Sequence, residues 1–117
     1  MTTEGSAVLN LEDYRAKSKD GTVAKVFTGR DRGEYVRENS GLDKLMDDFG
    51  HVEIIIPDKI YSINPSFFEE LFVNIINKIG KEEFLQRVKF TSLGKYNYVK
   101  PLNEAITRIL RSKSALE

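Results

Sequence analysis

The chain has 117 residues, no cysteine, a single histidine and a net charge of zero. This length fits one domain, and the absence of cysteine excludes disulfides and thiolate metal sites. Zero net charge argues against a protein that wraps nucleic acid, and no segment approaches the roughly 20 apolar residues that a membrane span needs.

The first part of the chain predicts two short strands followed by helical segments. Residues 8–11 and 23–28 alternate between apolar and polar side chains, and a turn signal between them suggests a hairpin. Thr28 stands three residues before Asp31, which is the spacing of a capped helix start. A second capping pattern near residue 40 predicts a break and a further helical stretch through residue 46.

The middle of the chain contains the strongest strand and the clearest helix. Ile54–Ile56 are consecutive β-branched residues, which predicts a central strand buried on both faces. A shorter extended piece at residues 60–63 leads into the helix. There Asn64 is a favoured N-cap, and Pro65 fits the first helical position.

Helical spacing of apolar residues continues from Phe67 to Ile79, and Gly80 is the expected stop. One more helical turn is expected after this glycine. A strand at residues 88–91, a loop and a last helix from about Pro101 complete the chain.

This order of elements, β-β-α-β-α-β-α, predicts an α/β fold in which helices cover a mixed β-sheet of four to five strands. We expect a single domain over residues 1–117, with frayed tails at residues 1–7 and 112–117. The strand at residues 8–11 is expected at a sheet edge, where two copies of the chain could associate.

The C-terminal part of the chain is basic. Residues 78–117 hold 9 of the 18 basic side chains and 4 of the 18 acidic ones. A basic face for an acidic partner would explain this excess, and so would a solvated last helix whose cations complement its dipole, which we favour. The N-terminus has neither the basic nor the apolar region of a signal peptide, so we expect a cytoplasmic protein.

No motif matches a known nucleotide loop or catalytic set. The chain contains neither G-x-x-x-x-G-K-[ST] nor G-x-G-x-x-G. Adjacent acids such as Glu69-Glu70 are interpreted as surface charge, because neighbouring helix residues point about 100° apart. The lone His51 provides neither a metal cluster nor a base with a partner. We therefore predict a protein that is not an enzyme and that binds no metal or cofactor.

Two arginines raise an alternative. In the segment 29–33, the guanidiniums of Arg30 and Arg32 could converge with helix N-terminal amides on a phosphate or nucleotide. Solvated arginines at a helix start explain the same residues, and we prefer that interpretation.

The turn Asn64-Pro65-Ser66 is the best candidate site, because it joins a strand to a strongly apolar helix. Ser66 falls in the first helical turn, among amides without intrahelical partners. A serine at the end of a rigid element can bind a partner or be phosphorylated, and the added charge could repel a docked acidic surface. Ordinary helix capping is the alternative explanation.

The stretch from Val52 to Phe68, VEIIIPDKIYSINPSFF, resembles the signature region of STAS domains, the fold of the anti-sigma factor antagonists. It is most similar to the STAS-like family of unknown function, in which a Ser-Phe pair opens this helix. Gly29, between a strand and a helix, fits the same pattern. The resemblance extends from about Val8 to Leu110 and is most specific between residues 54 and 79.

The resemblance implies a role in binding another protein. In anti-sigma antagonists this loop reads Asp-Ser-Ser/Thr-Gly, and a partner kinase phosphorylates its second hydroxyl residue. By position, Ser66 takes that place, while Asn64 replaces the Asp, Pro65 the first Ser and Phe67 the Gly; Ile56 stands where an Asp usually ends the strand. Because these departures remove groups that a kinase recognises, we predict binding at the turn and leave phosphorylation of Ser66 open.

The predicted function is therefore a protein-binding or partner-switching module, and the resemblance implies a histidine-kinase-like ATPase or anti-sigma-type protein as partner. The predicted binding residues are those of the turn together with exposed acids before and after it: Asp58, Asn64, Pro65, Ser66, Glu69 and Glu70. No nucleic-acid or membrane partner is expected. The alternative is a domain that binds a small anionic ligand through Arg30 and Arg32.

Overall fold

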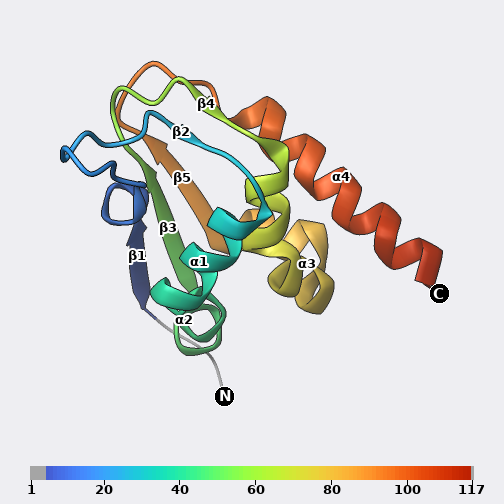
Figure 1. The fold of residues 1–117 in the computed structure, drawn as a ribbon. Helices are drawn as coiled ribbons and strands as arrows, with labels where there is room; N and C mark the ends of the chain where they lie inside the picture. The colour runs from blue at the N-terminus through green and yellow to red at the C-terminus, as the bar shows by residue number, and fades with distance from the viewer. Residues whose placement is uncertain (1–4, 117) are drawn as a thin grey trace.

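The strands of this protein form two parallel sheets, with helices packed against them (Figure 1). The computed structural model describes residues 5–116, so the expected tail residues 1–4 and 117 lie outside the described part. The elements in chain order are β1 (Ser6–Asn10), the 3₁₀ helix η1 (Leu11–Tyr14), β2 (Val26–Phe27), α1 (Arg30–Ser40), α2 (Leu42–Asp48), β3 (His51–Ile56), β4 (Ser62–Ile63), α3 (Pro65–Arg87), β5 (Val88–Ser92) and α4 (Val99–Leu116). The α/β class and the alternation of strands and helices are confirmed.

The larger sheet has the order β1-β3-β5, and the smaller sheet pairs β2 with β4. Leu9, Ile54 and Phe90 are in register across the three parallel strands. The expected hairpin between the first two strands is wrong, because β1 pairs with β3 and β2 with β4. The 15 residues between β1 and β2, which begin with η1, allow each strand to find a parallel partner far along the chain.

β3 is the central strand, as its sequence predicts, but only one of its faces is fully buried. Val52, Ile54 and Ile56 are buried, whereas Glu53 and Ile55 on the opposite face are partly exposed. The expectation of burial on both faces is therefore wrong. The helices cover the face that carries Ile54.

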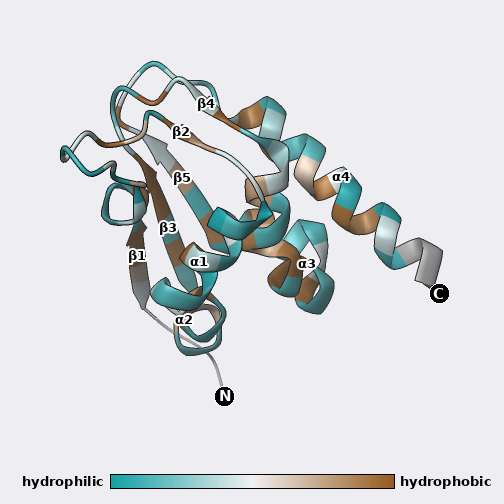
Figure 2. Cartoon of the chain, in the orientation of Figure 1, coloured by the Kyte–Doolittle hydropathy of each residue, from teal (hydrophilic) through white to brown (hydrophobic). Residues whose placement is uncertain are grey.

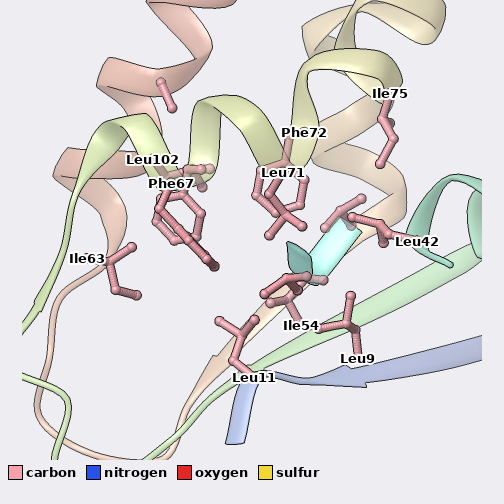
Figure 3. Packing of buried hydrophobic residues seen from close by; sticks show 14 of the residues in the cluster. Leu9, Leu11, Leu42, Ile54, Ile63, Phe67, Leu71, Phe72, Ile75 and Leu102 are labelled. Atoms are coloured by element: carbon pink, nitrogen blue, oxygen red, sulfur yellow. The ribbon is translucent and has the colours of Figure 1, made fainter. Parts of the chain in front are cut away.

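α3 supplies much of the core. The periodicity from Phe67 onward is confirmed, because its apolar stripe is buried: Phe67, Phe68, Leu71, Phe72, Ile75 and Ile76. Figure 3 shows side chains of this stripe directed toward strand residues such as Ile54 and Leu9. The Phe72 ring lies 5.0 Å from that of Phe84 in an edge-on contact, so aromatic packing connects the two parts of α3.

Gly80 interrupts α3 and the helix then resumes, as the sequence predicts. Its φ of 84° lies in the left-handed region that favours glycine. The second part of α3 returns toward α2, where Arg87 donates to the carbonyls of Met46, Phe49 (2.8 Å) and Gly50 (3.0 Å). These acceptors are at and after the C-terminal end of α2, where a cation is favourable.

α4 packs its apolar stripe against α3 and exposes a polar face (Figure 2). Leu102, Ala105, Ile106 and Ile109 are buried, as expected. The helix begins at Val99, two residues before the expected start, and it continues to Leu116, past the point where fraying is expected from the sequence. Within residues 5–116, no helix has the length and apolar character needed to cross a membrane.

Candidate functional site

Two strand-to-helix turns lie side by side at one end of the small sheet (Figure 1). β2 ends at Phe27 and leads into α1, and β4 ends at Ile63 and leads into α3. Phe27 is opposite Ile63, and the Asn64 N–H donates to the Phe27 carbonyl over 2.8 Å. In α/β proteins, ligands bind at the carboxyl ends of parallel strands. This edge is therefore the candidate functional site.

The Asn64 turn has the predicted geometry. Asn64 Oδ1 accepts hydrogen bonds from the Ser66 N–H (3.0 Å) and the Ser66 hydroxyl (2.9 Å), and Pro65 occupies the first helical position. Phe67 and Phe68 are completely buried. Asn64 is exposed and Ser66 is half-buried, so the turn is anchored from inside and accessible from outside.

The α1 turn differs from its prediction. The N-cap is Gly29, and no side chain caps the helix, so the expected capping role of Thr28 is not observed. Thr28 is exposed beside the turn. Thus α3 begins with a side-chain cap from Asn64, whereas the N-cap of α1 is a glycine, which has no side chain to cap the helix.

Tyr96 supports the candidate site from the loop after β5. Its hydroxyl accepts from the Ile63 N–H over 2.9 Å and donates to the Ile63 carbonyl over 3.4 Å. The Tyr96 carbonyl in turn accepts from Ser92 Oγ over 3.1 Å. The hydroxyl thus forms hydrogen bonds with both backbone polar groups of Ile63, as a residue of a neighbouring strand would. From the sequence, Tyr96 falls in the loop expected between the strand at residues 88–91 and the last helix, and only the tertiary contacts reveal this role.

A close helix crossing fixes α1 against the first turns of α3. A Cβ atom added to Gly33 would lie 2.6 Å from the Phe67 carbonyl oxygen and 2.9 Å from Glu70 Cβ. Only glycine allows this approach, because the nearest obstacle is backbone. A glycine inside a predicted helix is the one sequence signal that could have indicated this contact.

Glu69 and Glu70, predicted as partner-binding residues, form ion pairs within the domain. Glu69 lies 3.1 Å from Arg30 and 3.8 Å from Arg108, and Glu70 lies 3.2 Å from Arg37 and 3.7 Å from Arg30. The Glu69 side chain is only 12% exposed. The interpretation of this pair as solvated surface charge is therefore wrong: the two carboxylates connect α3 to α1 and α4.

The arginines of the α1 start have separate partners. The Arg30 guanidinium faces Glu69 and Glu70, whereas the Arg32 guanidinium lies over the Tyr35 ring, 4.7 Å from its centroid. The convergence of Arg30 and Arg32 on one anion is not observed. Within residues 5–116, no group of three acidic, histidine or cysteine side chains is arranged to hold a metal ion.

Exposed or half-buried residues lie in and next to β2, β4 and the Asn64 turn. We define the turn surface as Val26, Thr28, Tyr61, Ser62, Asn64 and Ser66. Tyr61 is 70% exposed and Val26 is 40% exposed, although both are large and apolar. The Lys25 ammonium lies 5.2 Å from the centre of the Tyr61 ring.

Asp58, the remaining predicted binding residue, lies in the turn between β3 and β4. It is exposed, and its carboxylate accepts from the Lys59 N–H over 2.8 Å. Asp58 therefore belongs to the same loop as Tyr61, but outside the turn surface.

Residues 58–98 match the family described as a STAS-like domain of unknown function. The expected resemblance is confirmed for this segment, which contains the Asn64 turn, α3, β5 and Tyr96. The match is narrower than the expected range from Val8 to Leu110. No curated protein and no solved structure shows a significant similarity to the chain.

Proposed function

We propose that this domain is a non-enzymatic protein-binding module whose partner docks on the turn surface. The observation that carries the proposal is the support of the Asn64 turn. The turn is fixed by the hydrogen bond from the Asn64 N–H to the Phe27 carbonyl and by the burial of Phe67 and Phe68. Ile63, the residue before Asn64, is bonded to the Tyr96 hydroxyl. A surface that is already rigid loses little conformational entropy when a partner binds.

The chemistry of Ser66 supports binding rather than catalysis. Its hydroxyl donates to Asn64 Oδ1, an amide oxygen that cannot take up the proton. A nucleophilic serine needs a base in this position. The exposed Tyr61 and Val26 suit an interface instead, because aromatic side chains are enriched at the energetic centres of protein interfaces.

The similarity to the STAS-like family and the resemblance to anti-sigma antagonists favour a histidine-kinase-like ATPase or anti-sigma-type protein as the partner. A protein of this kind is favoured over nucleic acid or a membrane because the chain has no net charge. Partner switching would follow from a charge change at Ser66. A phosphate there would stand one helical turn before Glu69 and Glu70, and it would compete with them for Arg30.

The test uses the domain as bait in a lysate of its native host, with captured proteins identified by mass spectrometry. We expect capture of an ATPase or anti-sigma-type protein, and we expect Ser66→Asp and Tyr61→Ser to reduce that capture at least tenfold. Ser66→Asp should still fold, because an acid in the first turn of α3 is favourable to the helix. Ser66→Ala separates loss of the hydroxyl from gain of charge.

Ser112→Asp is the matched control, because Ser112 is also an exposed serine but lies on α4. It should leave capture unchanged. If Ser66→Asp and Tyr61→Ser capture the same proteins in the same amounts as the unmodified domain, the turn surface is not the docking site.

The alternative, a small anionic ligand, is less well supported. One favourable feature is that α1 and α3 both begin at this edge, so that the positive ends of two helix dipoles are close together. Against it, the carboxylates of Glu69 and Glu70 occupy Arg30. A thermal-shift assay with phosphate and ATP tests this function, which requires a stabilisation that disappears in the double variant Arg30→Ala/Arg32→Ala.

A further inference from the structure

β1 lies at one edge of the larger sheet, as the sequence predicts (Figure 1). It pairs in parallel with β3, and among residues 5–116 no strand pairs with its other side. The strand at the opposite edge, β5, contains the exposed Lys89, and lysine is a residue that commonly protects sheet edges from other chains. β1 reads SAVLN, so it has neither the charged residues nor the proline that give such protection.

The backbone groups at the outer side of β1 belong to every second residue. The His51 N–H donates to the Gly5 carbonyl over 3.2 Å, which fixes the phase of the ladder between β1 and β3. In a parallel ladder, alternate residues of a strand turn both backbone polar groups toward the same neighbour. Gly5, Ala7 and Leu9 therefore face β3. The N–H and carbonyl groups that point away from β3 belong to the remaining residues of the strand: Ser6, Val8 and Asn10.

This arrangement suits pairing with a second copy of the same strand. A symmetric contact must bring one surface patch against itself, and a two-fold axis at Val8 does so for β1. In the antiparallel pair that results, Val8 is opposite Val8 of the second copy, and these two residues exchange both of their backbone hydrogen bonds. Ser6 is opposite Asn10, and Ala7 is opposite Leu9. Any shifted antiparallel register leaves at least one of the five residues of each β1 unpaired.

The side chains favour the same register. Val8 is 56% exposed although it is apolar, and it lies on the sheet face that the helices do not cover. The axis places the two Val8 side chains directly opposite each other, and cross-strand pairs of β-branched residues stabilise sheets. On the covered face, the small Ala7 is opposite the large Leu9 of the second copy. No like charges meet within the strand pair, because β1 has no charged residue.

We propose that the domain forms a symmetric dimer in which β1 pairs antiparallel with β1 of a second copy about a two-fold axis at Val8. The larger sheets of the two copies then join into one continuous sheet with the strand order β5-β3-β1-β1-β3-β5. No residue of the turn surface belongs to β1, so the dimer contact is separate from the proposed docking site.

Sedimentation equilibrium across a wide range of micromolar concentrations tests for the dimer. We expect the average mass to rise with concentration from the mass of one chain toward twice that value. Val8→Lys should raise the dissociation constant of the dimer at least tenfold, because two ammonium groups would meet beside the axis. Leu93→Lys is the matched control. Leu93 is also exposed and apolar, but it follows β5 at the opposite edge, so this change should leave the dissociation constant unaltered.

Val8→Pro provides a second variant if Val8→Lys does not fold. The Val8 N–H points away from β3, so proline removes the hydrogen bond to the second copy and keeps the ladder between β1 and β3. The dissociation constant should again rise at least tenfold.

Amide hydrogen exchange, followed by NMR at low and high protein concentration, locates the contact. The Val8 N–H has no strand to bond in the monomer and is bonded in the dimer, so its exchange should slow at least tenfold as the concentration rises. The Phe90 N–H is the control, because by the same alternation it points away from β3 at the opposite edge. Its exchange rate should not depend on concentration.

Three results would overturn the proposal. The first is the mass of a single chain at every concentration. The second is a dimer that both Val8→Lys and Val8→Pro leave intact. The third is a dimer in which the Val8 N–H exchanges as fast as in the monomer, which would mean that the two copies meet through another surface.

Discussion

Replacing Tyr96 with phenylalanine removes one oxygen atom and leaves the aromatic ring in place. That oxygen accepts from the Ile63 N–H over 2.9 Å, and Ile63 is only 2% exposed. In the variant this backbone N–H is left without a partner at a residue that is almost fully buried. An unsatisfied buried donor costs about 1–3 kcal/mol. The longer bond to the Ile63 carbonyl, at 3.4 Å, adds little.

We therefore expect Tyr96→Phe to lower the free energy of unfolding by about 2 kcal/mol. For a chain of 117 residues, the entropy of unfolding is about 0.25 kcal/mol per K, so Tm should fall by about 8 °C. Differential scanning calorimetry measures this change directly. Tyr35→Phe is the control, because Tyr35 is 47% exposed and its hydroxyl has no hydrogen bond within residues 5–116. A change in Tm of less than about 2 °C, equal to that of the control, would refute the role assigned to the hydroxyl.

Three further predictions concern the helix crossing, the cap and the Lys78–Asp47 ion pair. Gly33→Ala should destabilise the domain by about 1–2 kcal/mol in urea unfolding, since the overlap with the Phe67 carbonyl outweighs the helix propensity of alanine. Asn64→Ala should cost about 1 kcal/mol through the lost cap, whereas Asn64→Asp should retain stability; equal values for the two would contradict the capping role. Lys78 lowers the pKa of Asp47 below its ordinary 3.8, so Lys78→Met should raise it toward 3.8 in a carboxyl NMR titration. Because the folded pKa is depressed, this pair stabilises the fold above about pH 4 and stops doing so as the pH falls through the folded pKa.

Local features of the sequence were sufficient to predict α3. Its start depends on the capping chemistry of Asn64 and the fixed φ of Pro65, and its interruption depends on the tolerance of Gly80 for positive φ. Each of these effects acts between neighbours in the chain. The same holds for the central strand, since consecutive β-branched residues favour extended backbone wherever the strand is placed.

Strand partners could not be predicted in this way. The pairing of β2 with β4 joins residues about 36 positions apart through backbone groups that every residue carries. Two runs with a turn signal between them suggest a hairpin, yet parallel pairing with β3 places Leu9 beside Ile54 in the core. Burial of the whole sheet face, a property of the assembled molecule, decides between the two arrangements.

The Asn64 turn combines both kinds of information. Its sequence determined that a helix begins there and that Ser66 lies in the first turn, because these are local properties. Only the tertiary structure placed the turn beside α1, closed the edge of β4 with Tyr96, and directed Glu69 and Glu70 to arginines of other helices. The physical reason is that hydrogen bonds and ion pairs between distant segments depend on which surfaces pack together. The periodicity of a single sequence indicates which face of an element is apolar, but not which other element packs against that face.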